Sequence, residues 1–385
     1  MSKKPNASRA PSPEDADPPR ASDPARPFRV AVVGTGHWAA DVHIPGLISA
    51  GASVIAVCGR RDEPRRKVAE RYDIPQQFAD WQEMLDTSGA DGVSVCTPND
   101  LHTPISVAAA RKGLHIACEK PLATNVPDAR AAWDAARNVV TLVGFSHRFV
   151  PSAQLLKEMI EAGDLGEIYH VFAHMLQGWL VDANTPAGWR LNRAQAGGGT
   201  LGDLGSHLLD LVVWYAGDIA RISGHLRTFV TERPAPDGGT AKVDVDDAAS
   251  ALAEFAAGAT GVFTVSRYVC GTTSTFGTQG VTVAGSKGTV MYDPGRVNAL
   301  LLAERGQAYR QVEVPERLRM PSEDLRAHLP SAMMSRFVGG AQAGTRVRPD
   351  FEDGLRCQIL MDAWERSHRD GTWIEVPPMP EIGAR

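Results

Sequence analysis

The chain contains few cysteines, and none of them is placed for a metal site or an obvious disulfide. The five are widely spaced, odd in number and without a Cys-x-x-Cys pair: Cys58, Cys96, Cys118, Cys270 and Cys357. This pattern is typical of reduced, mostly buried thiols in a cytosolic protein and offers no zinc framework. We therefore expect a cytoplasmic protein without a metal site.

Long apolar runs and a basic surplus are also absent. No stretch approaches the length of about eighteen apolar residues that indicates a membrane-spanning helix. The 40 basic and 45 acidic side chains leave a formal net charge of −5, which argues against nucleic-acid binding. Residues 1–26 are rich in Pro, Ala, Ser and Asp and have no apolar core, so they indicate a disordered tail rather than a signal peptide.

Beyond the tail, short apolar segments alternate with helical ones. Strands are expected at 28–34, 53–59, 92–96, 114–118 and 140–145, each separated from the next by helical sequence. Alternation at this spacing predicts a parallel, doubly wound α/β sheet.

A glycine motif follows the first predicted strand. Gly34, Gly36 and Ala39 have the GxGxxA spacing between a strand and a helix, the context in which it indicates dinucleotide binding. Gly36 would let the backbone approach a pyrophosphate, and Ala39 would allow close packing of helix on strand. An ordinary strand–helix turn is the alternative. The predicted cofactor-binding residues here are Gly34, Thr35, Gly36, His37, Trp38 and Ala39.

The end of the second strand bears on cofactor choice. NAD-specific enzymes usually place an acidic residue there to accept the ribose hydroxyls, whereas this chain has Gly59 followed by Arg60 and Arg61. Two guanidinium groups favour a 2′-phosphate, and hence NADP(H), unless both are solvated residues at a helix start.

Two further strand ends carry polar side chains. TPNDLH closes one strand and EKPL the next, at the edge where open parallel sheets bind ligands. A lysine held at this edge by a following proline, which can be cis, is a candidate for chemistry; an exposed surface lysine is the alternative. The predicted cofactor contacts are Thr97, Pro98, Asn99, His102, Glu119 and Lys120.

A glycine-led helix at 197–214 presents two polar groups one turn apart. Asp203 and His207 are i, i+4 neighbours, and a buried stripe is formed by Leu201, Leu204, Leu208 and Leu211. The three glycines could form a phosphate-cradling loop, but that role is assigned to Gly34–Ala39, which follows a predicted strand. Two interpretations of the helix remain: a cap by Asp203 with His207 paired to Asp203 or Asp210, or a catalytic pair.

The remaining sequence favours an antiparallel sheet. Strand-like segments between residues 167 and 304 are joined by glycine-containing turns, among them the hairpin signal GSKG. We expect helices near 323–342 and 351–369 to cover one sheet face. An apolar uncovered face would need a partner, so the other face is a candidate oligomer surface.

Taken together, the segments VAVVGTGHWA, TPNDLH, EKPLA, VGFSHRFVP, AGWR and GGGTLGDLGSHLLDL resemble the glucose–fructose oxidoreductase/inositol dehydrogenase (Gfo/Idh/MocA) family of NAD(P)-dependent oxidoreductases. The resemblance implies a Rossmann domain at 27–148. It also implies an α+β domain at 149–385, with a large, open, mostly antiparallel sheet used for substrate binding and for assembly into a homodimer or homotetramer.

The resemblance also implies roles for individual residues. Lys120 corresponds to the family's catalytic lysine, and Asp203 and His207 to two further site residues. Gly59 departs from the usual acidic residue, and Ser146-His147 stands where an asparagine is frequent. Trp189 and Arg190 suit an aromatic platform and a hydrogen-bond fork for a polyol, or equally a packed loop. The expected substrate contacts are Lys120, Arg148, Trp189, Arg190, Asp203 and His207.

The expected reaction is hydride transfer between NAD(P) and a secondary alcohol or ketone of a sugar, cyclitol or sugar derivative. His207 is the first choice as general acid/base because its unperturbed pKa lies near working pH. Lys120 would hold the substrate oxygen or exchange its proton, and Asp203 would orient the site. The alternatives are a non-catalytic NAD(P)-binding regulator and an NAD-dependent hydrolase or lyase that works by transient oxidation.

Overall fold

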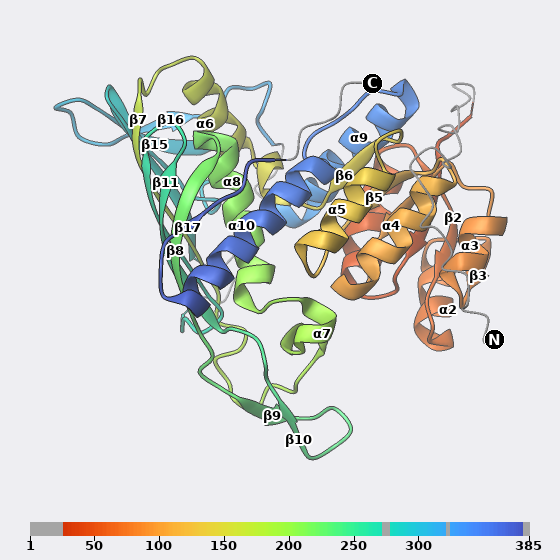
Figure 1. The fold of residues 1–385 in the computed structure, drawn as a ribbon. Helices are drawn as coiled ribbons and strands as arrows, with labels where there is room; N and C mark the ends of the chain where they lie inside the picture. Colours follow the sequence, from red (N-terminus) through yellow and green to blue (C-terminus); the bar gives the residue numbers. More distant parts are fainter. Residues whose placement is uncertain (1–25, 272–277, 321–323, 380–385) are drawn as a thin grey trace, which may run out of the picture.

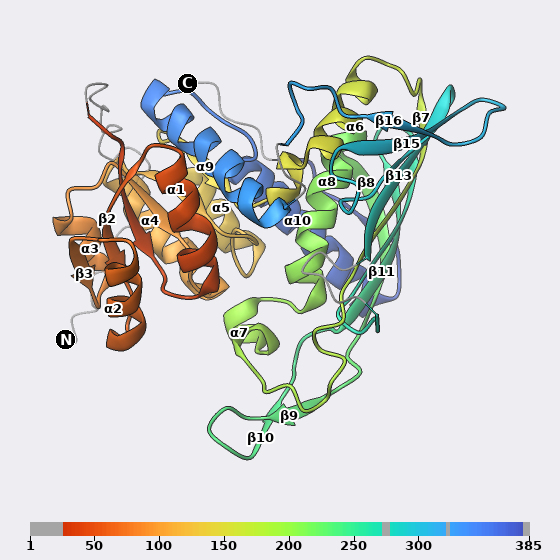
Figure 2. The same cartoon turned by 180° about the vertical axis from the view of Figure 1, so that it is seen from behind.

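The computed structural model describes residues 26–271, 278–320 and 324–379, and it contains two large sheets set beside each other (Figures 1 and 2). The predicted tail at 1–26 lies outside these residues except for Arg26. The Arg26 guanidinium lies 2.6 Å from the carboxylate of Asp91. No helix in the described ranges is long and apolar enough to span a membrane.

The first sheet is parallel, with six strands in the order β3-β2-β1-β4-β5-β6. Its strands are β1 (Arg29–Val33), β2 (Ser53–Cys58), β3 (Gln76–Phe78), β4 (Gly92–Val95), β5 (His115–Cys118) and β6 (Thr141–Val143). The strand residues of β4, β5 and β6 are all buried, as expected of a sheet covered on both faces. The prediction of a doubly wound sheet is confirmed.

Helices connect these strands. They are α1 (Ile44–Ser49), α2 (Asp62–Arg71), α3 (Trp81–Thr87), α4 (His102–Arg111) and α5 (Val126–Ala135). A π-helical turn, η2 (Trp38–His43), runs directly into α1, and Pro45, which has no N–H to donate to the preceding turn, lies at this junction. Asp80 caps α3 by accepting hydrogen bonds from the N–H groups of Gln82 and Glu83.

The second sheet has nine strands in the order β16-β15-β14-β13-β7-β12-β11-β8-β17. All neighbours are antiparallel except β7 and β12, which confirms a mostly antiparallel sheet. Its strands are β7 (Ile168–Leu176), β8 (Ile219–Arg227), β11 (Ala248–Phe255), β12 (Thr260–Ser266), β13 (Thr278–Gly285), β14 (Gly288–Tyr292), β15 (Ala299–Glu304), β16 (Arg310–Glu313) and β17 (Ile374–Glu375). The turn between β13 and β14 is the predicted GSKG hairpin.

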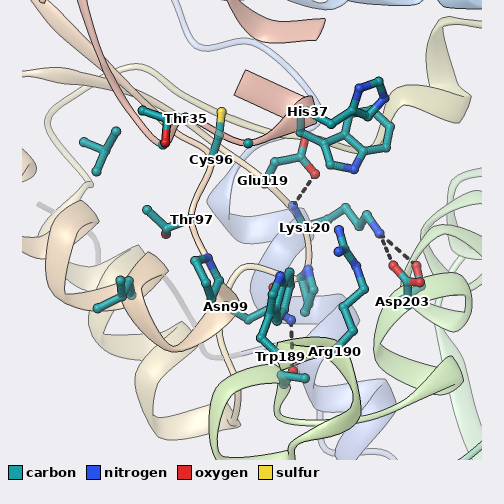
Figure 3. Close-up of a pocket in the computed structure, with 18 of the residues that line it drawn as sticks. Thr35, His37, Cys96, Thr97, Asn99, Glu119, Lys120, Trp189, Arg190 and Asp203 are labelled. Atoms are coloured by element: carbon teal, nitrogen blue, oxygen red, sulfur yellow. Dashed lines mark hydrogen bonds and ion pairs between the residues drawn. The ribbon is translucent and has the colours of Figure 1, made fainter. Parts of the chain in front are cut away.

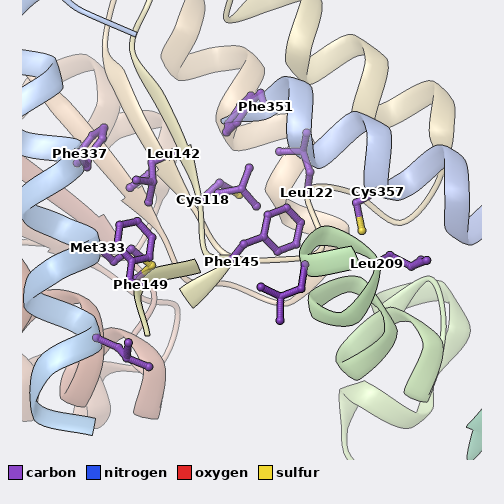
Figure 4. Close-up of a cluster of buried hydrophobic side chains, with 14 of the residues drawn as sticks. Cys118, Leu122, Leu142, Phe145, Phe149, Leu209, Met333, Phe337, Phe351 and Cys357 are labelled. Carbon is purple, nitrogen blue, oxygen red and sulfur yellow. The ribbon is translucent and has the colours of Figure 1, made fainter. Parts of the chain in front are cut away.

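One face of this sheet is covered by α6 (Pro151–Glu161), α8 (Ser206–Ala216) and α10 (Phe351–Asp370). The expectation that the helix near 323–342 covers it too is wrong. That helix, α9 (Leu325–Ala343), packs on α1 of the first domain, where a side chain at Gly46 would lie 2.5 Å from the carbonyl oxygen of Pro330. Figure 4 shows Met333 and Phe337 of α9 beside Leu142 of β6. The hydrophobic core therefore runs continuously through both domains.

A short arm projects from the second domain below α7 (Arg193–Ala196) (Figure 1). We define the arm as residues 178–191 together with 229–246, which include the paired strands β9 (Glu232–Pro234) and β10 (Thr240–Lys242). It has a small hydrophobic cluster of its own, separate from the main core, formed by Leu180, Leu191, Val243 and Val245.

Candidate functional site

A cavity of about 1010 Å³ lies between the two domains. On one side it is lined by the carboxyl ends of β1, β2, β4 and β5, and on the other by the arm, by the start of α8 and by residues at the ends of β7, β12 and β13. Ligands of open parallel sheets bind at the carboxyl ends of their strands, so the first half of this wall is where a dinucleotide would lie.

The glycine loop fits a dinucleotide. Gly34 has a φ of 131°, and a side chain there would lie 2.4 Å from the carbonyl oxygen of Cys96, so only glycine suits the turn. A side chain at Gly36 would instead meet nothing within 4 Å, which leaves room for a pyrophosphate against the backbone. The predicted cofactor residues that line the cavity are Gly34, Thr35, Gly36, His37, Trp38, Arg60, Arg61, Thr97, Pro98, Asn99, Glu119 and Lys120.

Lys120 joins the two domains within the cavity (Figure 3). Its ammonium group donates to the Asp203 carboxylate at 2.8 Å and to the Asp203 carbonyl oxygen at 3.0 Å. The second carboxylate oxygen lies 3.1 Å from the guanidinium of Arg267. Burial alone would raise the pKa of Asp203, but the cations Lys120, Arg267 and Arg190 hold it far below its usual value. Asp203 is therefore a permanent anion that orients the lysine.

The glycine-led helix begins with a π-helical turn, η6 (Leu201–Gly205), and continues as α8. Side chains at Gly197 and Gly199 would come within 2.7 Å of Thr124 and 2.0 Å of Asp246, so these glycines provide clearance. The backbone N–H groups of Gly199 and Leu201 donate to the Asp246 carboxylate, at 2.8 Å each. Because the chain's own carboxylate occupies this end, the phosphate-loop interpretation is wrong.

The capping arrangement, which was the structural alternative to a catalytic pair, is also not formed. No side-chain cap is found at the start of this helix, and the hydroxyl of Thr200 donates to the carbonyl of Asp247 instead. Asp210 pairs with Arg148 rather than with His207. The leucine stripe is confirmed, with all four residues buried: Leu201, Leu204, Leu208 and Leu211.

His207 lines the cavity next to a second histidine. The rings of His147 and His207 are edge to face, with centroids 4.6 Å apart. Within the described residues, Nδ1 of His207 has no hydrogen-bond partner. Burial, then Lys120 and then His147, lower the pKa of His207 well below its usual value, so its imidazole is neutral. Burial and Lys120 lower the pKa of His147 to about 4.

Three predicted site residues do not line the cavity. Ala39 is fully buried and packs behind the glycine loop. His102 is fully buried behind the wall, where its ring nitrogens lie 2.8 Å and 3.1 Å from the carbonyl oxygens of Pro121 and Thr97. It braces these two turns. The guanidinium of Arg148 forms ion pairs with Asp210 and Asp353, at 2.6 Å and 3.1 Å, and does not face the cavity.

Behind Lys120, a buried polar cluster holds the end of β5. His43 is fully buried between Glu119 and Ser94, whose side-chain oxygens lie 2.8 Å and 2.7 Å from its two ring nitrogens. Burial opposes protonation of His43, but Cys96 and Glu119 raise its pKa to about 10. A cationic His43 therefore pairs with the Glu119 carboxylate directly under the cavity, and the Lys120–Pro121 peptide that follows is cis.

Several side chains that line the cavity were not predicted as site residues, among them His147, Trp179, Arg267 and Gln279. Arg267 is the most important, because it shares Asp203 with Lys120. One signal for it exists in the sequence. Gly261, Phe263 and Val265 are the buried alternate positions of β12, and Arg267 continues this phase as a charged residue that is only 1% exposed.

Comparison with known proteins agrees with this architecture. Residues 28–147 match the model of an oxidoreductase family with an NAD-binding Rossmann fold, and residues 153–291 match a GFO/IDH/MocA C-terminal domain. Levoglucosan dehydrogenase of Pseudarthrobacter phenanthrenivorans is 30% identical over 341 residues, covering 81% of this chain and 86% of that protein. Myo-inositol 2-dehydrogenase of Thermotoga maritima is 27% identical, over 88% of this chain and 96% of that protein.

A solved structure supports the same assignment. Levoglucosan dehydrogenase in complex with NADH and levoglucosan superposes with a TM-score of 0.85 at 27% identity, covering 92% of this chain and 100% of that one. The family models together match more than half of the chain. The resemblance stated from the sequence motifs is thus confirmed: the chain belongs to the Gfo/Idh/MocA family of NAD-binding oxidoreductases.

Proposed function

We propose that the protein is a dehydrogenase that interconverts a secondary hydroxyl group and a ketone on a sugar, cyclitol or sugar derivative. One observation carries this proposal: the ammonium group of Lys120 is held 2.8 Å from Asp203 inside a cavity that also contains the glycine loop and His207. The names of the relatives, dehydrogenases of levoglucosan and myo-inositol, support the substrate class.

When bound, the nicotinamide cofactor supplies the acceptor or donor of the hydride. The chain's own residues handle the proton and the oxygen. Lys120 donates a hydrogen bond to the reacting oxygen, and Asp203 keeps the ammonium aimed at it. His207, kept neutral by its surroundings, accepts the hydroxyl proton during oxidation and returns it during reduction. Trp189 and Arg190, which stack with a guanidinium–ring distance of 4.4 Å, contact the rest of the sugar.

The cofactor of this family is NAD(H), and the levoglucosan dehydrogenase structures hold NADH. For this chain we also propose a preference for NADP(H). Arg60 and Arg61 are exposed and line the cavity at the end of β2, where they would meet a 2′-phosphate. Titration with NADPH and NADH tests this preference, and tighter binding of NADH would refute it.

We further propose that the protein is a homodimer or homotetramer through the large sheet. On the face away from the helices, Leu252 pairs with Val262, and Val262 with Phe172, to form one row across three strands. These side chains are 38–51% exposed. An apolar row in the middle of a sheet is suited to a second copy of the same surface. Light scattering tests this proposal by comparing the mass of the wild type, expected to be that of a dimer or tetramer, with the mass of V262E, expected to be that of a monomer.

The activity itself is tested by supplying levoglucosan, myo-inositol and D-glucosides with NAD⁺ or NADP⁺ and following the absorbance of the reduced cofactor. We expect at least one of these polyols to be oxidised. If tight cofactor binding accompanies no redox change with any polyol or with the matching ketones, the protein is a cofactor-binding regulator and the proposal is wrong. A substrate that is consumed without net cofactor reduction would instead indicate hydrolysis or elimination.

A further inference from the structure

The arm is organised around one buried arginine, Arg233 of β9. The residue is 1% exposed, and it does not line the cavity. No carboxylate of the described residues forms a salt bridge with it. A guanidinium group removed from water is costly unless its donors are satisfied. At Arg233 the acceptors for the two terminal nitrogens are supplied by the arm itself and by Tyr268, the residue that follows Arg267, whereas Nε has no hydrogen-bond partner among the described residues.

Arg233 holds the loop between β7 and α7 at three points. One terminal nitrogen donates to the carbonyl oxygens of Asp182, at 2.8 Å, and Thr185, at 3.2 Å. The other terminal nitrogen donates to the carbonyl oxygen of Leu180, at 2.7 Å, and to the hydroxyl of Tyr268. A loop of backbone carbonyls that converges on one planar cation has little freedom to move, because each N–H of the fork has its own direction.

Two of these four acceptors, Leu180 and Tyr268, lie one residue along the chain from side chains that line the cavity. Leu180 follows Trp179, and Tyr268 follows Arg267. Trp179 and Arg267 also contact each other, with the guanidinium 5.0 Å from the ring centroid. Arg267 in turn shares the Asp203 carboxylate with Lys120. A continuous set of contacts thus runs from Arg233 to the proposed catalytic lysine.

We propose that Arg233 is a positioning residue for the substrate end of the cavity: it fixes Trp179 and Arg267, and through Arg267 the direction in which Asp203 holds Lys120. This inference rests on the proposed function for its effect on turnover, but its structural part is independent of any substrate. Cofactor binding takes place on the other wall, which Arg233 does not touch, so loss of Arg233 should spare it.

The test uses R233M and R233K in the full chain, with R221M as the matched control. Arg221 lies on β8, outside the cavity, and its guanidinium pairs with Glu254 at 2.7 Å. Hydrogen exchange of the amides at 180–191 and 268–269 is measured with NADH bound. We expect faster exchange there in R233M, with segments of the first sheet unchanged. R233K keeps the charge but has three donors on one atom, so exchange should lie between R233M and the wild type.

The functional readout is the KM for whichever polyol the wild type oxidises best, beside the Kd for NADH. In R233M we expect KM to rise about tenfold or more, since misplaced binding groups weaken substrate orientation. The NADH Kd should stay within about twofold of the wild type, because the cofactor wall is intact. A purely structural residue would instead weaken NADH binding and lower stability together, and that result would overturn the proposal.

The outcomes separate the two proposals. Unchanged hydrogen exchange at 180–191 in both variants would show that Arg233 does not hold this loop, whatever the measured KM. Faster exchange with an unchanged KM refutes the positioning role. If R233M does not fold, the same measurements on R233K decide. If the wild type oxidises no polyol, the proposed function fails on its own, and hydrogen exchange still decides whether Arg233 holds the substrate wall.

Discussion

The Lys120 ammonium nitrogen lies 2.8 Å from the carboxylate of Asp203, across the boundary between the two domains. Lys120 lies two residues beyond the end of β5, and Asp203 belongs to η6, so neither domain contains the pair by itself. Docking of the domains therefore assembles the Lys120–Asp203 ion pair. The large shared core explains how the geometry is kept, because the two sides cannot separate without exposing apolar surface.

Replacement of Lys120 by methionine should abolish most of the turnover. The variant keeps the length of the side chain but removes the donor to the substrate oxygen, and loss of one preorganised donor to a developing charge costs about 10²–10³-fold in kcat. Steady-state kinetics with the best polyol measures the effect. The control is K112M, since Lys112 is a cation outside the cavity that pairs with Asp86 on the surface. A K120M enzyme with wild-type kcat would remove Lys120 from the mechanism.

The neutral state of His207 makes a second prediction. Burial, Lys120 and His147 keep its pKa well below the usual value, so the form that accepts a proton persists as the pH falls through 6.5. For oxidation, kcat/KM should therefore stay near its plateau at pH 6. Imidazole NMR gives the direct check. In K120M the pKa of His207 should rise toward 6.5, because the second-largest cause of its depression is removed. An unshifted titration in K120M would contradict this electrostatic account.

Motifs that are local in sequence predicted many of the residues that line the cavity. The role of Gly34 and Gly36 follows from their place between one strand and the next helix, and Asp203 and His207 are neighbours because they are one helical turn apart. Both relationships can be predicted from a short stretch of sequence. Long-range packing was not accessible. Arg267 reaches Asp203 only because the end of β12 lies against η6, and no short-range pattern states this.

The same limit explains the sequence predictions that missed. A helix with an apolar face predicts burial but not its partner, so α9 was expected on the large sheet and packs on α1 instead. A histidine or arginine beside a binding motif can face the ligand or brace the wall behind it, and local sequence does not distinguish the two. His102 and Arg148 are both behind the wall.

Arg148 should matter for stability. Its guanidinium makes two hydrogen bonds to Asp210, at 2.8 Å and 2.6 Å, and one to Asp353 at 3.1 Å, all buried. In R148M the buried Asp210 carboxyl group loses its guanidinium partner, whereas Asp353 keeps Arg348 at 2.6 Å. Breaking such a buried pair typically costs about 3–5 kcal/mol of unfolding free energy. Denaturant unfolding measures this loss.

The matched control for Arg148 is R137M. Arg137, just beyond the end of α5, forms a partly exposed ion pair with Asp134 of α5. Such surface pairs contribute about 0–1 kcal/mol, so R137M should unfold close to the wild type. Equal stability of R148M and R137M would show that Arg148 does not stabilise the core. The prediction that Arg148 contacts the substrate would then be favoured.

His147 should make the protein sensitive to acid. Its pKa is about 4 in the folded chain and 6.5 ordinarily, so the unfolded chain takes up the proton first as the pH falls. The stabilisation is complete above pH 6.5 and is lost between pH 6.5 and about 4, by about 3 kcal/mol in total. In H147N this part of the pH dependence of unfolding should disappear. The exposed His225 supplies the control variant, H225N; an unchanged slope in H147N would contradict the assignment.

The glycines that lead into η6 give a matched pair of variants. A side chain at Gly199 would lie 2.0 Å from the carbonyl oxygen of Asp246, whose carboxylate accepts from the backbone of Gly199, whereas a side chain at Gly202 meets nothing within 4 Å. G199A should therefore lose about 1–3 kcal/mol of stability through overpacking, and kcat should fall because Asp203 moves with the turn. In G202A, removal of a helical glycine should be neutral or stabilise by up to about 1 kcal/mol. Thermal unfolding and kcat are measured on the two variants. A loss in G199A alone would show that clearance at Gly199, rather than flexibility of the glycine run, sets the geometry of Asp203. Equal stability and equal kcat in G199A and G202A would contradict this role of Gly199.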